Sequence, residues 1–153
     1  MKSLRIWATV ARVGTTAWFF GNLYETAVGV PQLLADAPAR RLLGAGSPLR
    51  YWAPLGPLTL AATTTTLVGS WRSGGSKTAV VATAASTASA VAISAYLIRT
   101  VNIRLYGGSL TDADRRALIG RWHRLNGVRL GALVIASVAL QKVANPKTPD
   151  MTV

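Results

Sequence analysis

Four apolar stretches constrain the fold of this chain more than any other feature. A helix needs about 20 mostly apolar residues to cross the hydrocarbon core of a bilayer. The stretches that meet this requirement cover residues 8–34, 52–71, 78–98 and 125–144. The length of 153 residues suits a single domain. We therefore predict one all-α membrane domain over residues 1–153, an integral membrane four-helix bundle.

The composition agrees with this prediction and excludes several classes of site. Only 14% of the residues are charged, against about 25% in a typical soluble domain. The net charge is +12, but the basic residues separate the apolar stretches, as in loops that border a bilayer, so we expect lipid and not nucleic acid as the partner. The chain has no cysteine and one histidine, which excludes disulfides, multi-histidine metal centres and bis-histidine haem. We expect no metal and no cofactor.

The connections between the apolar stretches fit four spans. Residues 36–50 are rich in Pro, Gly and Arg, residues 72–77 form a short turn, and residues 103–124 make the longest connection. Within that connection Thr111 has the pattern of a helix N-cap, with Asp114 in the first turn. We predict a short extra helix there, which leads into the last span.

Four spans place both termini on the same side of the membrane. Every lysine lies on that side, which also carries the turn at residues 72–77, whereas the other two connections carry arginine and no lysine. Lysine is a hydrated point charge, while arginine offers a planar fork for specific pairing. We predict that the termini are cytoplasmic and the membrane is the plasma membrane, although a plain count of basic residues favours the opposite orientation. Trp7, Trp52 and Trp71 are interpreted as aromatic residues of the membrane interface.

Glu25 is the strongest single signal in the sequence. An ionisable group inside a span costs roughly 2.5–3.5 kcal/mol on insertion scales. Trp18, Asn22, Glu25 and Gly29 fall at helical spacing and share one face of the first span, and Tyr24 lies on a neighbouring face. This face either lines a cavity, with Glu25 as proton carrier or general base, or holds a structural ion pair with an arginine. We favour the functional interpretation, which is the default for intramembrane ionisable residues.

A second polar group opens the fourth span, in the run RWHRLNGVRL. Trp122, Asn126 and Arg129 stand at i, i+4 and i+7 and share one face, with His123 one step round the helix. Arg129 lies inside the span and needs a partner, which Glu25 can provide. His123 is suited to proton transfer near neutral pH, or it anchors the helix end at the interface.

A third polar group follows the third span, in the run RTVNIRLYGG. Asn102 stands in an otherwise apolar segment, and a buried amide needs partners. Arg99 can extend its charged group to the membrane surface. The candidate catalytic residues are Glu25, His123 and Arg129, and the candidate substrate-binding residues are Trp18, Asn22, Tyr24, Asn102, Trp122 and Asn126.

At these three groups the chain resembles the anthrone-oxygenase-like integral membrane proteins. The resemblance covers nearly the whole chain as a four-span layout. It rests on the run GNLYETAVGVPQLL, on TVNIRL with Asn102, and on the Trp–Asn–Arg pattern of Trp122, Asn126 and Arg129. The family usually has a proline near this Asn, in a V-P-x-N-like run, where this chain has Val101 and no proline. The resemblance implies cofactor-free chemistry on lipophilic aromatic or polyketide-like metabolites, such as oxidation of anthrones to anthraquinones, with Asn102, Trp122, Asn126 and Arg129 at the site.

Three functions fit these residues, and we favour a small membrane enzyme. In the enzyme, Glu25 or His123 removes a proton from a lipophilic substrate. Arg129, with Asn102 or Asn126, stabilises the resulting oxyanion. The product of that step reacts with dioxygen, as in a metal-free oxygenase, or rearranges, as in an isomerase or cyclase. The alternatives are a proton-coupled transporter that uses Glu25 and a structural partner subunit, and self-association into a homo-oligomer fits all three.

Overall fold

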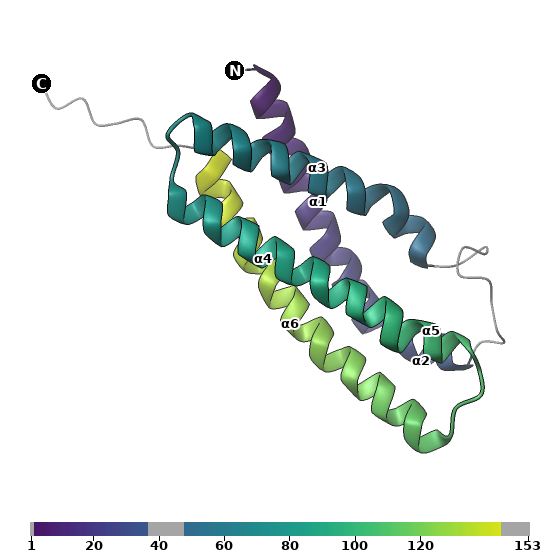
Figure 1. Ribbon diagram of the computed structural model, residues 1–153. Coiled ribbons are helices and arrows are strands. Elements are labelled where there is room, and N and C mark those ends of the chain that lie inside the picture. Colours follow the sequence, from purple (N-terminus) through teal and green to yellow (C-terminus); the bar gives the residue numbers. More distant parts are fainter. Residues whose placement is uncertain (1, 37–47, 145–153) are drawn as a thin grey trace, which may run out of the picture.

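The computed structural model of the protein describes residues 2–36 and 48–144, and every regular element in them is a helix (Figure 1). The four long helices are α1 (Lys2–Ala27), α3 (Pro48–Arg72), α4 (Lys77–Tyr96) and α6 (Asp112–Ala144). The shorter ones are α2 (Val30–Asp36), a π-helix (Leu97–Asn102) and α5 (Ile103–Tyr106). The π-helix and α5 extend α4 without a break. The predicted all-α fold with four long helices is confirmed, and most of the predicted connection at residues 36–50 lies outside the described residues.

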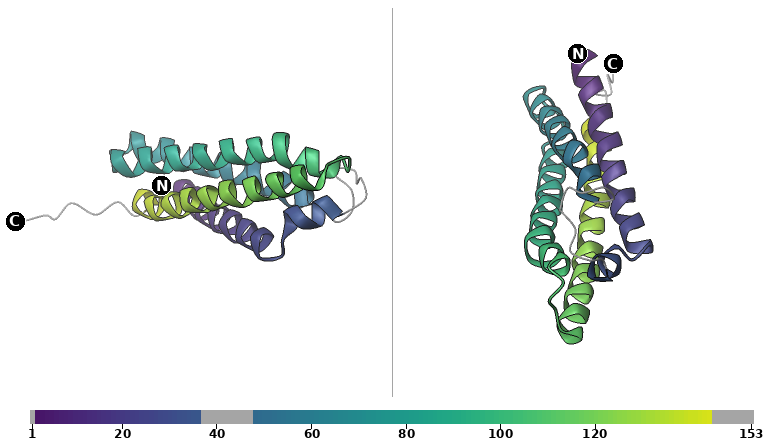
Figure 2. Two further views of the ribbon diagram at one scale, coloured as in Figure 1. Left: turned by 90° about the horizontal axis from the view of Figure 1, so that it is seen from below. Right: turned by 90° about the vertical axis from the view of Figure 1, so that its right-hand side faces the viewer.

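The long helices run alternately in opposite directions. The N-terminus, the turn between α3 and α4, and the end of α6 therefore share one end of the bundle (Figure 1). α6 lies between α4 and α1 in both further views (Figure 2) and packs closely against each of them. α3 packs mainly against α1 and contacts α4 and α6 only sparsely. The bundle is thus dense around α6 and looser around α3.

The first apolar stretch forms two helices, where the sequence predicted one. α1 ends at Ala27, and Gly29 turns the chain with a φ of 67°, a left-handed conformation that favours glycine. Pro31 then lies in the first turn of α2, where its missing N–H costs no hydrogen bond. The prediction that Gly29 shares a helix face with Trp18 and Glu25 is therefore wrong.

The last helix begins as predicted but is longer. The hydroxyl oxygen of Thr111 accepts a hydrogen bond from the backbone N–H of Asp114 at 3.2 Å, and the hydroxyl donates to the Asp114 carboxylate at 2.8 Å. The predicted short extra helix is not separate, because no proline interrupts the segment and α6 continues unbroken to Ala144. α4 and its extensions end at Tyr106, so the predicted connection at 103–124 shrinks to residues 107–111.

One helix, Lys77–Tyr106, is long and apolar enough to cross a membrane, with a mean hydropathy of 1.6 in its most apolar window. Only 17% of that window is buried inside the bundle, whereas the core helix of a water-soluble protein is mostly buried. No second helix in residues 2–36 and 48–144 meets the same standard of hydropathy and charge. Four long helices are confirmed, and four membrane spans stay a prediction.

Polar and small side chains share the interior with large hydrophobic ones such as Leu97, Leu133 and Trp122, while many other large hydrophobic side chains cover the outside. The buried polar residues are Thr15, Asn22, Thr59, Thr63, Thr66, Ser70, Thr83, Asn126 and Arg129. Several of these hydroxyls donate to a backbone carbonyl one turn earlier, as Thr83 does to Ala79 at 2.8 Å, which satisfies them at little cost. The exposed large residues include Phe20, Leu58, Val81, Val128, Val134, Ile135 and Val138. Exposed large hydrophobic residues in this number, together with buried polar residues, are unusual in a water-soluble domain.

α1 and α3 approach each other closely at Gly14. A Cβ atom there would lie 2.2 Å from Thr59 Oγ1, and the β-branched threonine has little freedom to move. We expect Gly14→Ala to lower the free energy of unfolding by about 1–3 kcal/mol, because an extra methyl group forces packed helices apart. The matched control is Gly131→Ala on α6, where a Cβ meets nothing within 4 Å.

Replacing a helical glycine with alanine in open space is expected to stabilise the helix by about 0.5–1 kcal/mol. The two variants should therefore shift the denaturation midpoint of the purified protein in opposite directions. A Gly14→Ala protein as stable as Gly131→Ala would show that α1 and α3 do not meet at Thr59.

Candidate functional site

A buried ion pair joins α1 and α6. Glu25 on α1 and Arg129 on α6 have side chains that are only 14% and 8% exposed, and Arg129 Nη2 lies 3.8 Å from Glu25 Oε2. The other carboxylate oxygen, Oε1, accepts a hydrogen bond from the indole N–H of Trp52 on α3 at 2.8 Å. The pairing of Glu25 with Arg129 that charge predicted is confirmed. At 3.8 Å the pair is electrostatic without a short hydrogen bond, so Oε2 can still accept a proton or a donor.

The guanidinium of Arg129 is held by two further partners. The side-chain oxygen of Asn126 accepts hydrogen bonds from Nε, at 2.9 Å, and from Nη2. The hydroxyl oxygen of Ser94 on α4 accepts from Nη1 at 3.1 Å. Contacts from α1, α4 and α6 therefore fix the plane of the guanidinium, and a planar fork with several fixed donors is the arrangement that suits oxyanion binding.

Asn126 ties this network back to α1. Its amide nitrogen donates to the backbone oxygen of Asn22 at 3.1 Å and to the hydroxyl of Thr26 at 2.6 Å. Asn22 in turn donates from its side chain to the backbone oxygen of Trp18 at 2.7 Å. Asn22 and Asn126 are both fully buried. They therefore act behind the ion pair, where they set the distance between α1 and α6.

A cavity of about 300 Å³ lies beside the ion pair. Its walls are mostly apolar and include three indole rings, those of Trp18, Trp52 and Trp122. The polar residues in the wall are Glu25, Ser94, Asn102, Tyr106 and Arg129. An apolar pocket with a few converging polar groups is the usual form of a small-molecule site.

Asn102 contributes an unpaired acceptor to this wall. It is the last residue of the π-helix, and its side-chain oxygen is buried without a hydrogen-bond partner among the described residues. Buried amide oxygens are nearly always paired, so this atom is available to a hydroxyl of a bound molecule. Short π-helices of this kind occur frequently at functional sites.

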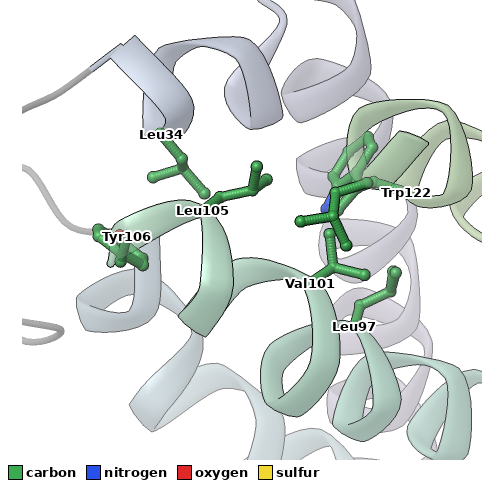
Figure 3. Close-up of a cluster of buried hydrophobic side chains, with 7 residues drawn as sticks. Leu34, Leu97, Val101, Leu105, Tyr106 and Trp122 are labelled. Carbon is green, nitrogen blue, oxygen red and sulfur yellow. The ribbon is translucent and has the colours of Figure 1, made fainter. Parts of the chain in front are cut away.

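Hydrophobic side chains from four elements pack together at the end of the bundle away from the N-terminus (Figure 3). This cluster consists of Leu34, Leu97, Val101, Leu105, Tyr106, Leu118 and Trp122. Leu34 comes from α2 and faces Leu105 of α5, while Trp122 approaches from α6 (Figure 3). Because Leu34, Leu97, Tyr106 and Trp122 also line the cavity, the cluster forms its end wall.

Two of the predicted site residues lie away from the cavity. His123 Nε2 lies 3.1 Å from the side-chain nitrogen of Gln32 on α2, and its ring packs edge-on against Trp122 with centroids 5.3 Å apart. His123 does not line the cavity, and neither does Tyr24, whose residue is 66% exposed. A salt bridge of 2.7 Å between Arg115 and Asp36 joins the same two helices as His123 and Gln32. His123 is thus placed where α2 meets α6.

Of the nine candidates, the structure brings five to the cavity wall: Trp18, Glu25, Asn102, Trp122 and Arg129. Asn22 and Asn126 stand behind that wall, and His123 and Tyr24 lie outside it. Sequence reasoning missed Trp52 and Ser94, which bond directly to the ion pair. The only sequence signal for Trp52 was a large polar-tipped ring near a span end, and this suggested the membrane interface.

In comparisons with known proteins, no family model, no curated protein and no solved structure matches this chain. The resemblance to the anthrone-oxygenase-like proteins stays a prediction from short motifs. The functional argument below starts from the geometry of the cavity and of the ion pair.

Proposed function

We propose that the protein is a membrane-embedded enzyme that binds a lipophilic, enolisable or phenolic molecule in its cavity and removes a proton from it with Glu25. The observation that carries the proposal is the position of this carboxylate. It stands in the wall of an apolar cavity of about 300 Å³, next to a fixed guanidinium. A base and an oxyanion-binding group side by side are the two parts that proton abstraction next to a carbonyl requires.

The distribution of side chains supports the membrane part of the proposal. Many large hydrophobic residues face outward, and several hydroxyls, two asparagines and an arginine face inward, which suits a lipid solvent. The long helices have 26, 25 and 33 residues, and the extended α4 has 30. At about 1.5 Å per residue, each exceeds the hydrocarbon thickness of about 30 Å. The proposed location is the plasma membrane, with both termini in the cytoplasm.

The shape and chemistry of the cavity support an aromatic substrate. Its volume lies at the small end of the range for ligand sites, about 300–1,000 Å³, so the ligand has few rings and little else. Trp18, Trp52 and Trp122 offer flat apolar surfaces, which suit stacking against a planar ring. The unpaired oxygen of Asn102 accepts a hydrogen bond from a ligand hydroxyl. An anthrone or a related polycyclic phenol has these properties, in agreement with the family resemblance.

The chemistry begins with one proton transfer. The bond between hydrogen and the acidic carbon or phenol oxygen breaks, the proton goes to Glu25 Oε2, and the electron pair moves onto the substrate oxygen. Arg129 stabilises that oxygen with its remaining N–H groups, while Ser94 and Asn126 prevent the guanidinium from moving. Return of the proton to another atom gives an isomer or a cyclised product. Reaction of the carbanion with dioxygen instead converts the methylene to a carbonyl and releases water.

Deuterium exchange tests the proton-transfer step alone. This step is common to isomerisation or cyclisation and to oxidation. The protein in lipid nanodiscs is mixed with anthrone in D2O under nitrogen, and the loss of the methylene proton signal is followed by NMR. We expect exchange at least about 10²-fold faster than in empty nanodiscs, the usual contribution of a positioned base. Equal rates with and without protein would overturn the proposal. Movement of a lipophilic cation across sealed vesicles in response to a pH gradient, without exchange, would assign Glu25 to transport.

A further inference from the structure

The most exposed residues of the cavity wall lie on two neighbouring helices. On α3, Gly56 and Leu60 are half-buried and Pro57 is exposed; on α4, Val91 is half-buried and Ala95 is exposed. The lining residues from α6, in contrast, are buried. The cavity therefore meets the outside of the bundle between α3 and α4, along the side of the molecule.

The packing of α3 agrees with an opening at this place. α3 and α4 contact each other only sparsely and diverge from the turn that joins them (Figure 1). Pro54 and Pro57 lie inside α3 and have no N–H, so the carbonyls of Arg50 and Ala53 lose their helical hydrogen bonds. Prolines are the commonest cause of bending in helices. At the opening, α3 is thus held only loosely against α4.

The rim of the opening carries no charge. Neither the segment 51–71 of α3 nor the segment 78–98 of α4 and its extension contains an Asp, Glu, Lys or Arg residue. Leu58, next to the opening on α3, is 51% exposed. A dissolved ion would find no residue of opposite charge on this path, whereas a neutral ring dissolved in lipid would lose no hydration on the way in.

From these three observations we infer that the substrate reaches the cavity sideways from the hydrocarbon core of the membrane, through a lateral portal between α3 and α4 at Gly56, Pro57 and Ala95. The inference rests on the proposed function and defines its substrate more closely. The substrate is a neutral, membrane-dissolved molecule as it enters, and it becomes an anion only beside Arg129. The uncharged rim then holds the anion inside until the reaction has removed its charge.

A removable plug at the portal tests the inference. The chain has no cysteine, so Gly56→Cys introduces a unique thiol at a position where a Cβ meets nothing within 4 Å. Benzyl methanethiosulfonate attaches a bulky ring to that thiol, and dithiothreitol removes it. Gly131→Cys on α6 is the matched control, because it is exposed, equally open and outside the cavity. Ala95→Cys repeats the test from the opposite rim.

Binding of anthrone in nanodiscs is followed by stopped-flow quenching of tryptophan fluorescence, since three tryptophans line the cavity. We expect the label on Gly56→Cys to slow both association and dissociation at least about tenfold, as a closed gate does. Slowed dissociation distinguishes a closed portal from a label that only fills the site, and dithiothreitol should restore both rates. Unchanged rates in labelled Gly56→Cys and Ala95→Cys, with binding intact, would overturn the portal alone. No binding in the unmodified protein would overturn the proposed function itself.

Discussion

Replacing Arg129 with methionine is expected to lower the free energy of unfolding by about 3–5 kcal/mol, the usual effect of removing one partner from a buried ion pair. Methionine fills much of the same volume but supplies neither charge nor donors. The carboxylate of Glu25 would then keep only the hydrogen bond from Trp52, and the oxygens of Ser94 and Asn126 would lose their donors. Chemical denaturation of the variant in detergent, followed by circular dichroism, measures the loss.

A double variant separates the charge from the packing. Glu25→Gln combined with Arg129→Met leaves no buried charge in the pair, and the amide oxygen of the new glutamine can still accept from Trp52. We expect the double variant to be more stable than Arg129→Met alone by about 1–3 kcal/mol, since residues in direct contact do not act additively. Equal stability of the two variants would show that Glu25 and Arg129 are not energetically coupled.

Glu25→Gln alone is expected to slow deuterium exchange on anthrone by about 10²–10⁴-fold, the contribution of a positioned general base. Glutamine has nearly the same shape as glutamate and cannot take up the proton. The affinity for anthrone should change little, because the tryptophan rings that surround the ligand remain in place. The NMR exchange rate and the equilibrium affinity, measured on the same nanodisc sample, separate these two effects.

The matched control for this variant is Asp36→Asn. It makes the same chemical change at an exposed carboxylate, which pairs with Arg115 at 2.7 Å outside the cavity. The exchange rate should be unaffected. Exchange that survives in Glu25→Gln and disappears in His123→Gln would move the base to His123, which stands at the contact between α2 and α6.

The fold was predictable where the sequence repeats one signal over many residues. Four long helices follow from four apolar stretches, and the start of α6 follows from the hydroxyl of Thr111 before an acidic turn. The break at Gly29 was missed because a positive φ is a property of one residue, and the surrounding apolar run hides it. The π-helix at Leu97–Asn102 has no recognisable sequence pattern, since it depends on how the end of α4 packs.

The parts of the site that depend on charge and on helical spacing were predictable from the sequence. Glu25 and Arg129 are ionisable residues inside apolar stretches, and each needs a partner of opposite charge. Helical spacing shows which residues share a face of one helix, but it does not show which neighbour that face meets. His123 therefore looked like a companion of Asn126 until α2 was found beside it. Ser94 is one of many serines and threonines in its helix, and only its position opposite Arg129 distinguishes it.

The small and hydroxyl-bearing residues of the interior also determine how this chain tolerates substitutions. In a water-soluble protein, the interior resists loss of bulk and the surface accepts almost any polar residue. Here the outward positions, such as Val134 and Ile135, should accept any large apolar residue, while Ala62, Thr83 and Gly14 inside should resist the gain of a single methyl group. At these positions the helices pack closely because the side chains are small, so small size is itself part of what specifies the fold.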